Sequence, residues 1–246
     1  MTQHMPQLFV VALALLFVGC GHPELSDDAQ ALLQQRVDAA TSAPVYVGDV
    51  RDVARPDDGT LFWYERRVDD GAISHLTRTT DGMPVVWIAV GTDDEAIRTV
   101  EEVHVRRGLV AHADVDDDRV LLRLQQGEGV QEELELAYTP PLVTGPTLFN
   151  HLLRHRDDLA AGVEFDFLSV ENRGVFRFAA NAAGDAGTFE VVPVDPLVRL
   201  VVPPLRVVYD DDTQQMVSYQ GPVPPLRDDG STFEGDVSYS AAQPFR

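Results

Sequence analysis

Two histidines, His151 and His155, have a spacing that suits metal chemistry. They lie four residues apart in a predicted helix, so both imidazoles project from one face, as two zinc ligands do. The residue after His151 is Leu152 rather than the glutamate of a metalloprotease motif, and no third ligand is evident. Arg154 and Arg156 beside them would repel a cation. His151 and His155 are therefore weak metal candidates, and surface or cap-adjacent histidines are the preferred interpretation.

Three aspartates, Asp114, Asp116 and Asp118, match the first three ligand positions of an EF-hand calcium loop, which places alternate oxygens around one cation. The sixth position of such a loop needs glycine and here holds Arg119. The twelfth position needs a bidentate glutamate and here holds Gln125. A polar turn is therefore the preferred interpretation, and we predict no bound metal.

Motifs for cofactor binding and nucleophilic catalysis are missing from the sequence. It contains no GxSxG nucleophile elbow, no GxGxxG or P-loop motif and no CxxC pair. With 40 acidic residues, almost any spacing of two carboxylates can be found, so paired acids carry no information. We therefore predict a non-enzymatic protein without a cofactor. A hydrolase that uses His151 or His155 with nearby acids stays open as an alternative.

The only cysteine, Cys20, comes directly after an apolar run at residues 8–18 and Gly19. This run is too short to span a bilayer as a helix, but it has the length of a signal-peptide core. The segment Phe17-Val18-Gly19-Cys20 resembles the lipobox of bacterial lipoproteins. Two features depart from that pattern, since Phe17 replaces the preferred leucine and no lysine or arginine precedes the apolar run. An ordinary secretory signal with an incidental cysteine is the alternative.

The lipobox resemblance implies how the chain is processed and where it resides. Residues 1–19 would be removed, and a diacylglyceryl group on Cys20 would anchor the mature chain in a membrane. Gly21 stands where an aspartate would, by analogy with enterobacterial lipoproteins, favour inner-membrane retention. We therefore expect a protein of the bacterial cell envelope, anchored in the outer membrane and facing the periplasm.

The charge of the chain is strongly negative, with 40 acidic and 19 basic residues and a net charge of −21. Every basic residue is arginine. Nucleic acid and an anionic membrane surface are excluded as main partners, because their phosphates would be repelled. The aspartates fall mostly in turn positions, so they indicate a solvated surface rather than an acidic binding surface.

Alternating polarity from residue 44 onward predicts a mainly all-β protein. We expect an antiparallel meander that forms a strongly curved sheet or an open β-barrel. The clearest hairpin runs from Leu205 to Gly221, with its three aspartates in the turn. The other expected strands are 45–50, 61–68, 72–79, 84–90, 97–106, 109–115, 119–125, 130–138, 163–170, 175–180, 188–194 and 233–240.

Two longer helices are expected, one N-terminal and one internal. The first begins after the N-cap Ser26 and runs to about Ala40, and the second covers Thr147 to Ala161 and plugs or caps the sheet. The chain is thus divided into a signal peptide at 1–19, a lipid-anchored tether and helix at 20–43, and one β-rich domain at 44–246. A lobe boundary near residues 139–146, which are rich in proline, stays open as an alternative.

Seven aromatic side chains alternate within the expected strands. Core packing is the preferred interpretation, and the alternative is that they line a concave sheet able to bind an apolar ligand. These residues are Phe62, Tyr64, Trp87, Phe165, Phe167, Phe176 and Phe178.

The part of the chain from Thr147 to Tyr239 resembles a set of β-rich bacterial envelope proteins known as domains of unknown function. The similar features are LAAGVEFDFLSVENRGVFRF after the helix, then VDPLVRLVVPPLRVVYDDDTQQMVSYQGPVP, and a closing DDG turn with its strand. The resemblance implies a secreted or lipid-anchored β-protein, and it implies no reaction.

Three functions are compatible with these observations, in order of preference. The first is a non-enzymatic envelope lipoprotein whose curved sheet or barrel binds or carries an apolar molecule, which predicts an apolar cavity. The second is a structural or assembly lipoprotein that acts through an envelope protein partner, which predicts an exposed apolar patch or an unpaired strand edge. The hydrolase named above is the third.

Overall fold

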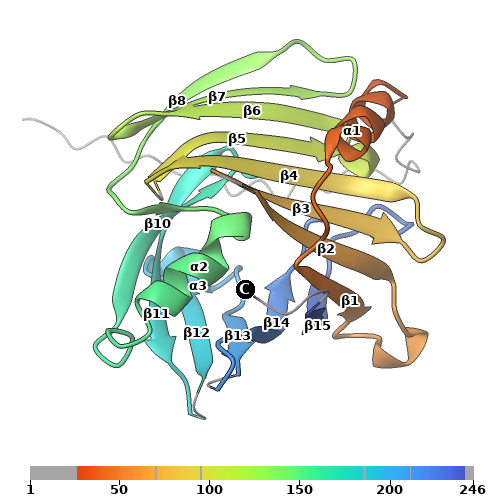
Figure 1. Cartoon of the computed structure of the whole chain (residues 1–246). Coiled ribbons are helices and arrows are strands. Elements are labelled where there is room, and N and C mark those ends of the chain that lie inside the picture. The colour runs from red at the N-terminus through yellow and green to blue at the C-terminus, as the bar shows by residue number, and fades with distance from the viewer. Residues whose placement is uncertain (1–26, 70, 95, 185–186, 211, 242–246) are drawn as a thin grey trace, which may run out of the picture.

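The computed structural model of the chain contains one 15-stranded β-sheet, which is antiparallel apart from one strand pair (Figure 1). The structure describes residues 27–241 except 70, 95, 185–186 and 211. Ser26, the predicted signal peptide and Cys20 lie outside the described residues. The expected fold class, a mainly all-β protein with a curved open sheet, is confirmed.

The helices and strands follow the expected order along the chain. The helices are α1 (Asp27–Ala39), α2 (Gly145–Arg154) and α3 (Pro196–Arg199), with short 3₁₀ turns η1 (Pro56–Asp58) and η2 (Val105–Arg107). The strands are β1 (Tyr46–Asp52), β2 (Phe62–Asp69), β3 (Ala72–Thr79), β4 (Pro84–Asp93), β5 (Ala96–His104), β6 (Leu109–Val115), β7 (Arg119–Gln126), β8 (Glu132–Ala137), β9 (Leu142–Val143), β10 (Val163–Ser169), β11 (Gly174–Ala182), β12 (Thr188–Pro193), β13 (Leu205–Tyr209), β14 (Met216–Pro222) and β15 (Glu234–Ala241).

The sheet consists of two meanders that meet at the first and last strands. Strands β1 to β8 lie side by side in chain order, strands β9 to β15 do the same, and β1 pairs with β15. The short β9 is parallel to β10, and every other pair is antiparallel. The two ends of the sheet, β8 and β9, are not paired with each other, so the sheet is open.

The sheet bends back on itself, because an apolar cluster joins its two halves. Leu168 and Val170, at the end of β10, pack with Val100, Ala111 and Leu122 of β5, β6 and β7. Figure 1 shows the two meanders arching around α2. The sheet therefore has a concave face, which carries α2, and an outer face.

The outer face is covered by α1. Ala29 and Leu33 of this helix pack on Leu76, Trp87 and Val103 of β3, β4 and β5. Two aspartates occupy the first turn, where the helix dipole favours negative charge. The predicted N-terminal helix is thus confirmed.

The concave face is covered by α2, the internal helix. Its apolar residues Leu148, Phe149 and Leu152 are buried in the largest apolar cluster. Pro146 stands in the first turn, where its missing N–H is not needed. The expected position of an internal helix against the sheet is confirmed.

The predicted end of this helix at Ala161 is wrong, because α2 ends at Arg154. His155 is the C-cap residue, and residues 155–161 form turns. Leu159 is nevertheless buried in the same cluster as Leu152. Leu159 follows Leu152 by seven residues, about two helical turns, so the sequence pattern is the same as that of a longer helix.

The short helix α3 and the two residues after it carry the most exposed apolar side chains of the second meander. Leu197 is 73%, Leu200 81% and Val201 46% exposed. The edge strand β8 is also exposed along much of its length and has no strand on its outer side. Both are surfaces of the kind that proteins use for contacts. Among the described helices, none combines the length and the apolar character needed to span a bilayer.

Candidate functional site

The structure brings the two predicted histidines together but does not make them a metal site. The ring centroids of His151 and His155 are 4.7 Å apart. His151 is buried against Phe165, its Nε2 has no hydrogen-bond partner among the described residues, and burial, His155 and Arg154 lower its pKa to about 4. Within the described part of the chain, no group of three His, Cys, Asp or Glu side chains is arranged to hold a metal ion. His151 is therefore a neutral core residue.

Two of the three aspartates of the calcium pattern, Asp116 and Asp118, lie in a turn, and Asp114 lies in β6 just before it. Asp114 Oδ2 is 2.7 Å from Arg123 Nη1, and its Oδ1 is 3.1 Å from His112 Nε2. Asp116 to Asp118 form the exposed turn between β6 and β7. The first of these carboxylates thus pairs with Arg123 and His112.

The seven aromatic side chains are divided among different clusters. Four of them, all on β10 and β11, pack in the same cluster as α2. Two on β2 belong to a neighbouring cluster near the pairing of β1 with β15. Trp87 lies on the outer face under α1. The seven side chains therefore do not form one ligand-lining surface, although six of them share the concave side with α2.

A cluster that sequence reasoning missed is centred on Arg66, in the concave face beneath α2. Arg66 of β2 is the register partner of Tyr46 on β1 and of His75 on β3. Tyr64 lies two residues earlier on β2 and therefore on the same face. Arg66 is 2% exposed, so a guanidinium is buried at the centre of this face.

Within the described part of the chain, the buried guanidinium makes three hydrogen bonds, all to neutral acceptors. Arg66 Nη1 donates to Pro146 O at 2.9 Å and to His75 Nε2 at 3.1 Å, and Nη2 donates to Asn150 Oδ1 at 2.8 Å. Two of these acceptors belong to α2, and Tyr209 Oη also donates to Phe149 O of α2 at 2.6 Å. Arg66 and Tyr209 therefore attach the helix to the sheet through polar contacts.

The protonation states in this cluster follow from the hydrogen bonds. A guanidinium has only donors, so His75 Nε2 must accept and the imidazole proton must be on Nδ1. Nδ1–H then donates to Tyr64 Oη. Burial and the charge of Arg66 lower the pKa of His75 well below its usual value, and burial raises the pKa of Tyr64 well above its own. Both side chains are therefore neutral at physiological pH.

Tyrosine rings surround Arg66, and Gly48 makes room for them. The Tyr64 and Tyr239 rings are 5.6 Å apart, edge to face, across Gly48 of β1. A Cβ atom at residue 48 would lie 3.0 Å from the Tyr239 ring, tighter than normal contacts allow. Phe149 of α2 completes the group, 6.1 Å from Tyr239. The concave face is thus aromatic around one buried cation.

A second charged cluster lies where the two halves of the sheet meet. His104 Nε2 is 3.1 Å from Glu102 Oε2, and Nδ1 is 3.4 Å from Glu171 Oε1 without hydrogen-bond alignment. Glu171 Oε2 is also 3.1 Å from Arg107 Nη2. Burial raises the pKa of Glu171, and His104 and Arg107 oppose that rise. These charges connect β5 and η2 with the turn after β10.

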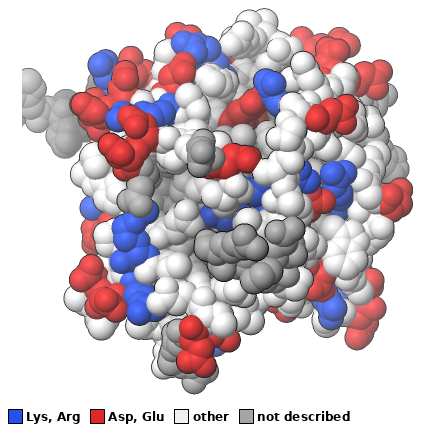
Figure 2. All heavy atoms as spheres, in the orientation of Figure 1, with Lys and Arg blue, Asp and Glu red and all other residues white. Residues whose placement is uncertain are grey.

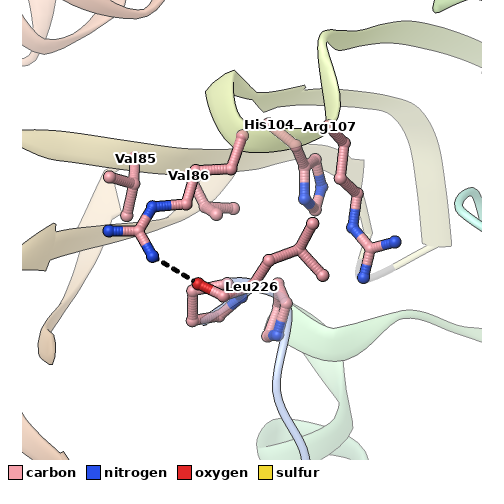
Figure 3. Close-up of a pocket in the computed structure, with 8 residues that line it drawn as sticks. Val85, Val86, His104, Arg107 and Leu226 are labelled. Carbon is pink, nitrogen blue, oxygen red and sulfur yellow. Dashed lines mark hydrogen bonds between the residues drawn. The ribbon is translucent and has the colours of Figure 1, made fainter. Parts of the chain in front are cut away.

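The loop at residues 223–233 contacts Arg106, which follows β5 (Figure 3). Arg106 Nη1 donates to Leu226 O at 2.6 Å, the bond drawn in Figure 3, and Arg106 Nη2 is 2.8 Å from Asp228 Oδ1. Figure 3 shows Val85, Val86 and Leu226 around a narrow hollow, which is too small for a water molecule. This hollow is a packing feature rather than a ligand site.

Another hollow, of about 210 Å³, lies on the outer face between α1 and strands β6 and β7. Its lining includes Leu32, Val110 and Gln125 and none of the seven aromatic residues. Charged side chains of both signs are interspersed over the face seen in Figure 2. The charges in that view therefore do not form a patch of one sign.

No protein-family model and no curated protein sequence matches this chain.

Proposed function

We propose that this chain is a non-enzymatic lipoprotein of the bacterial cell envelope whose concave sheet face binds an apolar molecule. Anchoring through a diacylglyceryl group on Cys20, in the outer membrane and facing the periplasm, is part of the proposal and rests on the lipobox resemblance. The resemblance of residues 147–239 to envelope β-proteins supports the same compartment.

The observation that carries the proposal is the position of α2. Leu148, Phe149 and Leu152 cover an aromatic concave face in a sheet that is open along one side. The segments on both sides of the helix, residues 139–144 and 155–162, have no regular secondary structure except for the two residues of β9. A helix of this kind can move away from the concave face, so that an apolar ligand packs on the sheet in its place.

A molecule bound in this way is expected to co-purify with the protein. We expect full-length protein, extracted from its own membranes in a mild detergent, to carry one non-covalent apolar molecule in native mass spectrometry. The same spectrum is expected to show a covalent mass that begins at a diacylated Cys20. Protein that retains no small molecule in several detergents would contradict binding, and an uncleaved or unmodified N-terminus would contradict the anchor.

Weakening the contact between α2 and the sheet is expected to increase ligand access. In Leu152→Ala, we expect a photoactivatable fatty alcohol to crosslink at half-saturating concentrations roughly tenfold lower than in the wild type, because the closed state loses about 1.4 kcal/mol or more. Crosslinked peptides are identified by mass spectrometry.

Leu33→Ala is the matched control for this experiment. Leu33 is also a completely buried helical leucine, but it belongs to α1 and packs on the outer face of the sheet. We expect it to lose similar stability without a change in crosslinking. Equal effects of the two variants would indicate general loosening and contradict a cover at α2.

A second candidate function is favoured by the exposed apolar side chains of α3. Leu197, Leu200 and Val201 form the patch expected of an assembly lipoprotein that acts through a protein partner. The co-purification experiment separates the two functions. A stoichiometric envelope protein without a bound small molecule would favour this candidate.

A further inference from the structure

We infer that Arg66, together with the Tyr64 hydroxyl, binds the oxyanion of an amphipathic ligand, a carboxylate or phosphate headgroup on an apolar chain. This inference rests on the proposed function and adds the chemistry of the headgroup. It concerns a site in the concave face, next to the aromatic surface that α2 covers.

The first support is that Arg66 has no carboxylate partner among the described residues, although the chain has a large excess of acids. Isolated buried ions are strongly unfavourable, and proteins normally pair them. Four less deeply buried arginines follow that rule. They are Arg67 with Glu65 at 2.6 Å, Arg106 with Asp228 at 2.8 Å, Arg107 with Glu171 at 3.1 Å and Arg227 with Asp52 at 2.7 Å.

The second support is the set of donors that Arg66 leaves unused. A guanidinium has five N–H groups, and the three hydrogen bonds of Arg66 involve only Nη1 and Nη2. Within the described residues, its Nε–H has no acceptor. In a guanidinium, Nε–H and one of the two Nη2–H groups share an edge of the plane, the geometry that binds two oxygens of a carboxylate or phosphate.

The third support is the Tyr64 hydroxyl. Because Tyr64 Oη accepts the proton of His75 Nδ1, its own O–H remains available to donate. Burial keeps the phenol protonated, since it raises the pKa of Tyr64. Arg66 and Tyr64 thus present donors side by side on β2, which suits an anion and disfavours a cation.

The apolar part of such a ligand has an adjoining surface. The rings of Tyr64, Tyr239 and Phe149 follow one another, with Phe149 contributed by α2. A charged oxygen makes stronger hydrogen bonds to a guanidinium than the neutral Pro146 O and Asn150 Oδ1 do. The headgroup would therefore bind at the unused donors of Arg66, while the apolar chain takes the place of Phe149 on the aromatic surface.

The test compares three photoactivatable ligands with the same apolar chain, a fatty acid, a monoalkyl phosphate and a fatty alcohol, on full-length protein in neutral lipid nanodiscs. At about pH 8, where both acids are ionised, we expect at least one anion to half-saturate crosslinking at about tenfold lower concentration than the alcohol. Which anion does so distinguishes a carboxylate from a phosphate headgroup.

Variants then assign the preference to the site. Arg66→Gln is expected to remove the advantage of the anion and leave the alcohol unchanged, and Tyr64→Phe to reduce the advantage about threefold. Arg67→Gln, the neighbouring residue on the opposite face of β2, is expected to keep it. Thermal unfolding checks that each variant is folded. If Arg66→Gln does not fold, Tyr64→Phe decides the question.

Two results would overturn the inference in different ways. Equal crosslinking by anions and alcohol in the wild type, or an anion preference that survives Arg66→Gln and Tyr64→Phe, would refute headgroup recognition but leave the proposed function intact. Absence of crosslinking by all three ligands would refute the proposed function as well.

Discussion

Asp52→Ala is expected to lower the free energy of unfolding by about 3 kcal/mol, because it breaks a buried ion pair and leaves its partner charge uncompensated. The Asp52 side chain is 1% exposed, and its Oδ2 accepts from Arg227 Nε at 2.9 Å and Nη2 at 2.7 Å. Its Oδ1 accepts from the Ala54 N–H at 2.9 Å. The pair holds the loop at 223–233 to the end of β1, so the variant is also expected to free that loop.

Urea unfolding of both proteins measures this difference, and Asp49→Ala is the control. Asp49 lies on the same strand and pairs with Arg51 at 2.8 Å near the surface, where a salt bridge contributes less than about 1 kcal/mol. Similar losses in the two variants would contradict the special role of Asp52. Burial alone would raise the pKa of Asp52, but hydrogen bonds from Arg227 and Ala54 lower it overall. Its contribution is therefore complete above its ordinary pKa of 3.8 and is lost as the pH falls toward the lower folded value.

Acidification between pH 6.5 and about 4 is expected to destabilise the protein through His151. The pKa of His151 is 6.5 in the unfolded chain and about 4 in the folded one, because burial and the neighbouring His155 and Arg154 disfavour its charge. In this pH range the unfolded state binds a proton at His151 and the folded state does not. The free energy of unfolding therefore falls as the pH is lowered. The full loss is at most about 3 kcal/mol.

The variant His151→Leu removes this titration and is expected to flatten the dependence of unfolding free energy on pH between 6.5 and 4. His112→Leu serves as control, since His112 is exposed on β6. Denaturant unfolding at several pH values compares the slopes. If His151→Leu and the wild type lose stability in parallel, His151 is not the group responsible.

Most strands and the first helix were predictable, because one periodicity dominates each segment. Residues 72–79, 109–115 and 205–209 alternate or run apolar between turn residues, and their observed bounds equal the expected ones. The two-residue β9 was not predictable, because nothing in Leu142-Val143 distinguishes it from a loop. The end of α2 was missed because Leu159 returns to the core through turns rather than through a helix.

The Arg66 cluster shows where sequence reasoning stopped short. Phe62 and Tyr64 lie on the face of β2 that packs in the core. Because side chains alternate between the two faces of a strand, Arg66 must lie on the same face, and the sequence alone allowed this prediction. The neighbours Glu65 and Arg67 concealed it by making the segment look like an exposed charged stretch. The tyrosines and Asn150 that complete the cluster come from distant segments, and no local pattern could bring them together.

Trp87 illustrates the opposite difficulty. It stands in the run Val85 to Ile88, where every residue is apolar, so alternation cannot say which face each side chain takes. The structure places Trp87 under α1 and its neighbours Val86 and Ile88 in a cluster on the other face. Only the packing of α1 on the outer face distinguishes the position of Trp87 from that of Val86 and Ile88.

The pairing of β1 with β15 has a consequence for the order of folding. Val47 and Ser240 lie side by side although 193 residues separate them in the chain, whereas the strands within each meander are neighbours in sequence. Hairpins between such neighbours form within microseconds, while a contact at this separation carries a much larger loop-closure entropy. Each half-sheet therefore exists with a bare edge until β15 is available. The β1–β15 junction is where a folding helper would protect the newly made chain from self-association.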